Sequence, residues 1–280
     1  MKVAVISDIH IDEQESESIF EEVFADCVNQ TNADYLLIAG DISEYYLRTL
    51  AFIRRLEKKI SPKIYFSPGN HDLWSKYEPG ISVQNVINYL KSEKGSDGFI
   101  QNQAVRLSEN TVLIAGCGWY DYSFAHPGMF TKEHLEQKKY KGRWWRDGQY
   151  ANHGVDDTEV DLMWNNELKN LVNLYSDSDI IFMTHMLNHP AFLVGETSKQ
   201  YEIFKYFNAY LGSEGLYEIT KHDSIKFAVS GHVHYRSSFA EDGTYYMCRC
   251  LGYPREFPAF GGDLQLEAQI IDAMEVIEIK

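Results

Sequence analysis

Short apolar runs, separated by longer amphipathic segments, mark the first part of the chain. Residues 3–7, 35–39 and 63–67 are mainly apolar and lead into polar residues, as buried strands do. The stretches between them, about 15–31 and 46–59, are long enough to form helices. This alternation predicts βαβ crossovers and a parallel sheet that is buried on both faces. Ligands of such sheets collect just beyond the carboxyl ends of the strands.

The middle of the chain has both clear patterns and one long segment without any. A helix is expected at about 80–92, and strands are expected at 104–107 and 111–115. Residues 121–155 show no periodicity but carry many aromatic residues and scattered glycines, which is typical of a lid or binding loop. We therefore expect a single domain over residues 1–280 with an irregular insert at about 121–155.

The last part of the chain again has helical and strand patterns. Apolar residues recur at helical spacing from Val160 to Tyr175, and acidic residues precede them, where the positive end of a helix dipole favours them. Residues 180–183 and 226–229 are expected to be further buried strands. Three C-terminal segments are β-rich or alternate, and they predict a second sheet formed by antiparallel pairing: 237–240, 245–250 and 268–279.

Composition and charge narrow the classes of function. The 280 residues are 44% hydrophobic and 24% charged, as in a packed globular protein rather than a disordered or fibrous one. The 26 basic and 41 acidic side chains give a net charge of −15, which disfavours extended nucleic-acid binding. No apolar run approaches the ~18 residues of a membrane span, and no signal peptide is visible, so we expect a cytoplasmic protein. The four cysteines are expected to be buried free thiols.

Each of the five predicted buried strands ends in residues that can bind a metal ion. A single Asp or His after a strand is more often a cap or a turn residue. Five such endings, which we expect on the ligand-binding edge of one sheet, indicate a functional site. Gly40, Gly69 and Gly231 each precede a candidate, where a sharp turn or a close backbone approach is needed. The candidates are Asp8, His10, Asp41, Asn70, His71, Asp72, His185, His232 and His234.

These endings read Asp-x-His, Gly-Asp, Gly-Asn-His-Asp, a lone His and Gly-His-x-His, in this order. Together they resemble the five signatures of the calcineurin-like metallophosphoesterases, and the resemblance runs from Asp8 to His234. It implies an α/β fold, a four-layered α/β/β/α sandwich of two mixed sheets flanked by helices, with a dinuclear metal site at the carboxyl edge of the strands. By the same resemblance, Asp8, His10 and His234 would bind one metal ion. Asn70, His185 and His232 would bind the other, and Asp41 would bridge both.

The donor chemistry agrees with this expectation. A set of imidazoles, carboxylates and one amide, with no thiolate, favours divalent or trivalent transition-metal ions such as Mn²⁺, Fe²⁺/Fe³⁺ or Zn²⁺. A water that bridges two such ions loses its proton near neutrality, because metal coordination lowers its pKa from ~15.7 to ~7. We therefore expect hydrolysis of a phosphate ester by this hydroxide. The ester would be a phosphodiester or phosphomonoester of a small molecule or nucleotide.

His71 is our candidate for the general acid, because it follows the expected ligand Asn70 and because the matching histidine of the family is assigned to protonating the leaving group. A protonated imidazole needs an acceptor to hold it. Glu44, three residues after Asp41, is the first candidate for this acceptor, and Asp72 is the second.

Substrate specificity is harder to infer from the sequence. Arg143, Trp144, Trp145 and Arg146 lie in the insert and could stack on a base or clamp a phosphate. The expected partner is a small phosphorylated or nucleotide substrate, and no membrane partner is expected. The sequence does not predict the oligomeric state. A protein phosphatase and a nuclease of the same superfamily are alternatives, although the net charge disfavours the nuclease. A scaffold protein that has lost catalysis is the alternative from another class.

Overall fold

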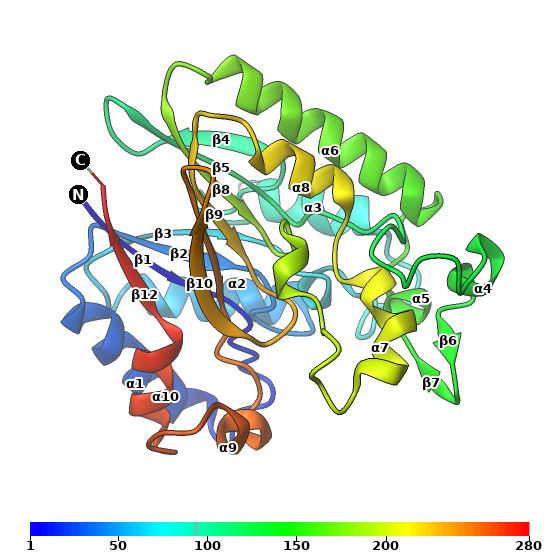
Figure 1. Ribbon diagram of the computed structural model, residues 1–280. Coiled ribbons are helices and arrows are strands. Elements are labelled where there is room, and N and C mark those ends of the chain that lie inside the picture. Colours follow the sequence, from blue (N-terminus) through cyan, green and yellow to red (C-terminus); the bar gives the residue numbers. More distant parts are fainter. Residues whose placement is uncertain (93, 280) are drawn as a thin grey trace.

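The computed structural model describes residues 1–92 and 94–279, and over this range the chain forms a four-stranded sheet, a six-stranded sheet and a two-stranded hairpin (Figure 1). The four-stranded first sheet has the order β12-β1-β2-β3. β1, β2 and β3 pair in parallel, and β12 pairs antiparallel with β1. The bounds are β1 (Lys2–Ile6), β2 (Tyr35–Ala39), β3 (Lys63–Ser67) and β12 (Glu275–Glu278).

The six-stranded second sheet has the order β10-β11-β9-β8-β5-β4. Its inner strands pair in parallel, whereas the edge strands β4 and β10 pair antiparallel with their neighbours. Both sheets are therefore mixed, as expected. The bounds are β4 (Gln103–Arg106), β5 (Thr111–Gly116), β8 (Asp179–Thr184), β9 (Ile225–Ser230), β10 (Arg236–Glu241) and β11 (Thr244–Arg249).

The two sheets pack face to face, and helices cover their outer faces (Figure 1). Because side chains alternate along a strand, Val3 and Val5 of β1 point between the sheets while Ala4 and Ile6 face the helices. The core between the sheets joins Val3, Val5 and Leu37 to Leu113, Ala115, Ile181, Met183, Val229 and Met247. The longer helices are α1 (Glu17–Gln30), α2 (Tyr46–Leu56), α3 (Val83–Lys91), α6 (Asp157–Leu174), α8 (Glu214–Thr220) and α10 (Leu266–Ala273).

The insert contains short elements instead of the irregular chain that the sequence predicts. They are too short to show periodicity, and aromatic contacts such as the stacked rings of Tyr140 and Tyr206, 4.8 Å between centroids, hold them to the body. They project beside α7 (Tyr201–Phe207) in Figure 1. These elements are α4 (Lys132–Glu136), β6 (Lys139–Tyr140), β7 (Arg143–Trp144) and α5 (Asp147–Tyr150).

The prediction for residues 268–279 was wrong in part. This segment begins within helix α10, and only its end forms a strand, β12, which joins the first sheet and not the second. Ile270 and Ala273 are fully buried on the helix, which lies against α1. β10 and β11 do form the expected antiparallel hairpin, but β11 also pairs in parallel with β9 on its other side.

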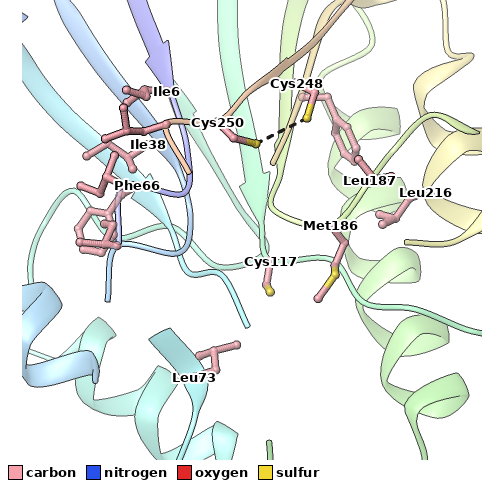
Figure 2. Packing of buried hydrophobic residues seen from close by; sticks show 14 of the residues in the cluster. Ile6, Ile38, Phe66, Leu73, Cys117, Met186, Leu187, Leu216, Cys248 and Cys250 are labelled. Carbon is pink, nitrogen blue, oxygen red and sulfur yellow. Dashed lines mark hydrogen bonds between the residues drawn. The ribbon is translucent and has the colours of Figure 1, made fainter. Parts of the chain in front are cut away.

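The prediction that five strand endings share one sheet was also wrong. β1 to β3 belong to the first sheet, and β8 and β9 belong to the second. The two sheets meet at the ends of these strands, where Ser7 forms a bridge with Cys250 and its N–H donates to the Arg249 carbonyl at 2.9 Å. Figure 2 shows side chains of both sheets near this junction, with the Cys248 and Cys250 sulfurs 3.7 Å apart. The endings therefore still converge.

Two simpler expectations can be compared with the described residues. All four cysteines are buried free thiols, as expected. Among residues 1–92 and 94–279, no helix has both the length and the apolar character needed to cross a membrane.

Candidate metal centre

The candidate donors lie in tight turns directly after their strands. Five of the seven expected ligands have positive φ angles, which side chains other than glycine rarely adopt: Asp8 (52°), His10 (39°), Asp41 (54°), His232 (73°) and His234 (54°). Close backbone approach explains two of the neighbouring glycines. A Cβ at Gly69 would lie 2.0 Å from Asp41 Oδ1, and one at Gly231 would lie 2.5 Å from Asp8 Oδ2.

One set of donors, the Asp8 group, consists of Asp8, His10 and His234. The Nε2 atoms of His10 and His234 are 3.1 Å apart. Asp8 Oδ1 lies 3.4 Å from His234 Nε2 and 4.0 Å from His10 Nε2. The three ligand atoms thus face a common point, as three donors to one cation would.

A second set, the Asn70 group, consists of Asn70, His185 and His232. His185 Nε2 lies 3.0 Å from Asn70 Oδ1 and 3.0 Å from His232 Nδ1. Asp41 lies between the two groups, because its Oδ1 is 3.4 Å from His185 Nε2 and its Oδ2 is 3.8 Å from His10 Nε2. One carboxylate therefore presents one oxygen to each group. The structure brings all seven expected ligands together.

Hydrogen bonds on the far side of two rings determine which nitrogens carry protons. His185 Nδ1 lies 2.9 Å from the Ala39 carbonyl oxygen, which can only accept, so Nδ1 is the donor. His234 Nδ1 lies 2.6 Å from Glu256 Oε2 and donates in the same way. In the neutral form of each ring, Nε2 therefore carries no proton, and its lone pair faces other acceptors. Such a cluster needs a proton or a metal ion between these atoms.

The electrostatics of the site agree with this conclusion. Burial alone lowers the pKa of His185, but the charge of Asp41 and the hydrogen bond to it raise this pKa to about 9. Burial likewise opposes the charged form of His234, and the bonds to Asp8 and Glu256 raise its pKa to about 10. The carboxylates therefore draw one positive charge into each donor group. The residues fit a pair of metal ions.

His71 lies beside Asp41. Its backbone N–H donates to Asp41 Oδ1 at 3.0 Å, and its ring Nε2 is 3.8 Å from Asp41 Oδ2. The ring stacks on Trp74 with 3.7 Å between centroids. Its Nδ1 is 4.0 Å from Glu44 Oε1, which is too long for a hydrogen bond, and Glu44 forms an ion pair with Lys76. Glu44 is thus close to His71 without holding it in this conformation.

Asp72 has a different set of partners from the one we expected. Its oxygens accept hydrogen bonds from the N–H groups of Ile42, Ser43 and Gly69 and from the Thr49 hydroxyl, at 2.6–3.3 Å. No hydrogen bond or ion pair joins Asp72 to the His71 ring among the described residues. Asp72 therefore connects the loop that carries Asp41 to the loop that carries Asn70.

A cavity of about 920 Å³ opens over the donors. We call the seven expected ligands and His71 the floor, and five of these eight residues line the cavity: Asp41, Asn70, His71, His232 and His234. We call the residues around the opening the rim, with Trp144, Trp145, Arg146, Phe204 and Arg255 among them. Arg143, which we also expected at the substrate, does not line this cavity.

The sequence analysis missed several residues of this site. Asp147 is buried and accepts hydrogen bonds from four side chains, among them Asn70. Glu256 holds His234, and the Tyr253 ring packs 4.5 Å from that of His10. Each lies in a segment without strand or helix periodicity, so no local pattern distinguishes it from a surface residue.

Comparison with known proteins identifies the family. The family model of the calcineurin-like phosphoesterases matches residues 1–236, and the chain belongs to this family. An uncharacterized protein of Acanthamoeba polyphaga mimivirus is 23% identical over 269 residues, which are 90% of this chain and 91% of that protein. An uncharacterized metallophosphoesterase of Helicobacter pylori is 27% identical over 128 residues, which are 44% of this chain but only 30% of that protein.

Solved structures share the fold at low sequence identity. A phosphopantetheinyl hydrolase of Mycobacterium tuberculosis is 15% identical with a TM-score of 0.77, and the match covers 99% of this chain and 95% of that one. A dimetal phosphatase of Danio rerio is 13% identical with a TM-score of 0.53, over 89% of this chain and 86% of that one. The family binds a dinuclear transition-metal centre, which agrees with the two donor groups.

Proposed function

We propose that this chain hydrolyses a small phosphate ester in the cavity above its two donor groups. The observation that carries the proposal is that seven donors and His71 converge, with five of these eight residues lining one cavity. The Asp8 group would hold one ion, the Asn70 group would hold the other, and Asp41 would bridge them. Mn²⁺, Fe²⁺/Fe³⁺ and Zn²⁺ suit this mixture of imidazole, carboxylate and amide donors.

The bound ions supply positive charge for the phosphate oxygens and a water nucleophile at neutral pH. This positive charge is essential in a chain with a net charge of −15. His71 then acts as the general acid, which donates its proton to the leaving oxygen. Stacking on Trp74 and the backbone bond to Asp41 fix the position of its ring, and Glu44, with Oε1 4.0 Å from Nδ1, is the carboxylate that would stabilise its charged form.

The rim indicates which esters to test first. A cavity of about 920 Å³ is within the range of ligand sites, roughly 300–1,000 Å³, and leaves room for an extended alcohol group beside the phosphate. Trp144 and Phe204 offer apolar contact to this group, and Arg146 offers a charge. A phosphopantetheinyl ester belongs in the panel, because a protein of the same fold carries the name of such a hydrolase.

The test is an activity screen with matched metal controls. We expect the chain, loaded with Mn²⁺, to hydrolyse a small monoester or diester, to lose this activity in chelator, and to regain it when Mn²⁺ returns. A preference for phosphopeptides or single-stranded nucleic acid would instead identify a protein phosphatase or a nuclease. Binding of fewer than two ions without any turnover would favour the scaffold. A cytoplasmic location stays a prediction that cell fractionation would test.

A further inference from the structure

Asp147 connects the insert to the Asn70 group. It is the first residue of α5, and its side chain is buried, with the residue 1% exposed. Oδ1 accepts hydrogen bonds from Asn70 Nδ2 at 2.8 Å and from Trp74 Nε1 at 2.7 Å. Oδ2 accepts from Trp145 Nε1 at 2.7 Å and from the Tyr120 hydroxyl at 3.2 Å. Four donors from three segments of the chain therefore share one carboxyl group.

This arrangement determines which end of the Asn70 amide faces the other donors. An amide has a donor end and an acceptor end, and only the oxygen is a metal ligand. Asp147 can only accept from Nδ2, so Oδ1 must point the other way, to within 3.0 Å of His185 Nε2. If the amide rotated by half a turn, its NH₂ group would face the donor cluster and its oxygen would face the Asp147 carboxylate.

The second oxygen of Asp147 makes the connection to the insert. Trp145 stacks on Tyr210 at 5.3 Å between centroids, and its ring lies edge-on to His232, 5.5 Å away. The backbone N–H of Trp145 donates to the carbonyl oxygen of Lys138, the residue before β6, at 2.7 Å. The segment 139–150 thus contacts two members of the Asn70 group. Asp147 accepts a hydrogen bond from Asn70, and the Trp145 ring packs against His232.

We propose that Asp147 is a positioning residue that selects the coordinating end of Asn70 and couples segment 139–150 to the ion in the Asn70 group. Coupling between two binding events is reciprocal. Loss of Asp147 therefore weakens the binding of this ion, and binding of the ion in turn orders the segment. The Asp8 group has no bond to Asp147 among the described residues, so its ion is unaffected. The inference rests on the metal centre of the proposed function but not on turnover.

The experiment compares Asp147→Asn with the wild-type chain. The variant keeps the shape of the side chain but places an NH₂ group where only donors point, so one or more of the four bonds is lost. Mn²⁺ is titrated into the metal-free chain by calorimetry. We expect two binding steps in the wild type, and in the variant one step weakened by about 10–100-fold and the other within about twofold. Asn70→Ala should weaken the same step, and His234→Ala should weaken the other.

Hydrogen exchange gives a readout that is independent of activity. In the wild type, Mn²⁺ should slow amide exchange in 139–150 by about fivefold or more, and Asp147→Asn should abolish this protection. Asp161→Asn is the matched control, because Asp161 is also buried but lies on α6; it should leave both readouts unchanged. If Asp147→Asn does not fold, Trp145→Phe takes its place, since it removes the bond from Trp145 to Asp147 and should reduce the protection.

Each remaining outcome is decisive. Equal weakening of both steps, unchanged binding, or wild-type protection of 139–150 in Trp145→Phe would overturn the coupling. A wild-type chain that binds no Mn²⁺ would overturn both the coupling and the proposed function. A wild-type chain that binds two ions and shows the coupling, but hydrolyses no ester, would contradict the proposed hydrolysis alone.

Discussion

The floor of the cavity consists of strand ends, whereas its rim consists of loops and short elements that cross above them. Floor residues such as Asp8 and His232 are held in left-handed backbone by the turns that end their strands. On the rim, Trp144 is 52% exposed and makes its cation–π contact with Lys139 of its own hairpin. The sheets therefore fix the floor, while the rim depends on a few anchoring contacts, of which Asp147 provides several.

This difference suits the floor and the rim to different tasks, the chemical step and substrate recognition. The reaction needs donors placed to within fractions of an ångström, and paired strands deliver such accuracy. Recognition of the alcohol part of the ester tolerates looser positioning, which loops provide. Substitutions in the floor should therefore change the rate of the chemical step, and substitutions in the rim should change substrate binding.

The largest effect is expected at Asp41, which faces both donor groups. Asp41→Asn removes the shared negative charge and should lower kcat/KM by about 10⁴-fold, or about 5 kcal/mol of transition-state stabilisation. Steady-state kinetics with Mn²⁺, together with metal analysis of the purified variant, would measure this change. A loss below tenfold would contradict the bridging role of Asp41.

His71 is the next test of the floor, because its effect depends on the leaving group. His71→Ala should lower turnover by ~10²–10⁴-fold for alkoxide leaving groups and much less for nitrophenolate, which needs no proton. Parallel assays of an alkyl ester and a nitrophenyl ester would measure this. An equal loss on both substrates would contradict a general acid.

The rim variants should have smaller effects on a different parameter. Trp144→Ala and Arg146→Ala remove contacts that form equally in the ground state and the transition state, so KM should rise by about 3–10-fold with little change in kcat. Arg143→Ala is the matched control, because Arg143 belongs to the same hairpin but does not line the cavity. A large fall in kcat without a change in KM would show that the rim contributes to the chemical step.

The smallest effect is expected on stability, at a buried acid outside the cavity. Burial raises the pKa of Asp161 to about 7, so the folded state holds its proton more tightly than the unfolded state, and the free energy of unfolding falls as the pH rises from about 4 to 7. Asp161→Asn should remove this loss and stabilise the chain by about 1–3 kcal/mol more at pH 8 than at pH 4. Urea unfolding at the two pH values would measure the difference, and parallel curves for both chains would contradict it.

The donors could be predicted from the sequence because each one lies within four residues of the end of a buried strand. Asp8 and His185 come within two residues of strand ends, so the pattern that predicts the strand also places the side chain. The partition into two sheets could not be predicted in this way. Strand pairing joins residues such as Ser7 and Cys250 that lie far apart in the chain, and the apolar runs themselves do not specify their neighbours.

The residues that support the donors show the same limit. Asp147 accepts bonds from Asn70 and Trp74, more than 70 residues before it, and its own segment has no periodicity. For α10 the information was present, because Ile270 and Ala273 have a helical spacing, but the β-rich end of the segment suggested a strand instead. Sequence patterns therefore indicate the groups that do the chemistry more readily than those that hold them.

The positive φ angles of the donors have a consequence for how this chain could change over generations. Left-handed backbone costs about 1 kcal/mol or more at each such residue, and glycine or asparagine relieves most of it. In a lineage no longer selected for hydrolysis, exchange of His10 or His232 for either residue would relieve this backbone strain. Histidine at these strained positions is therefore expected only where the side chain has a role that offsets the backbone strain.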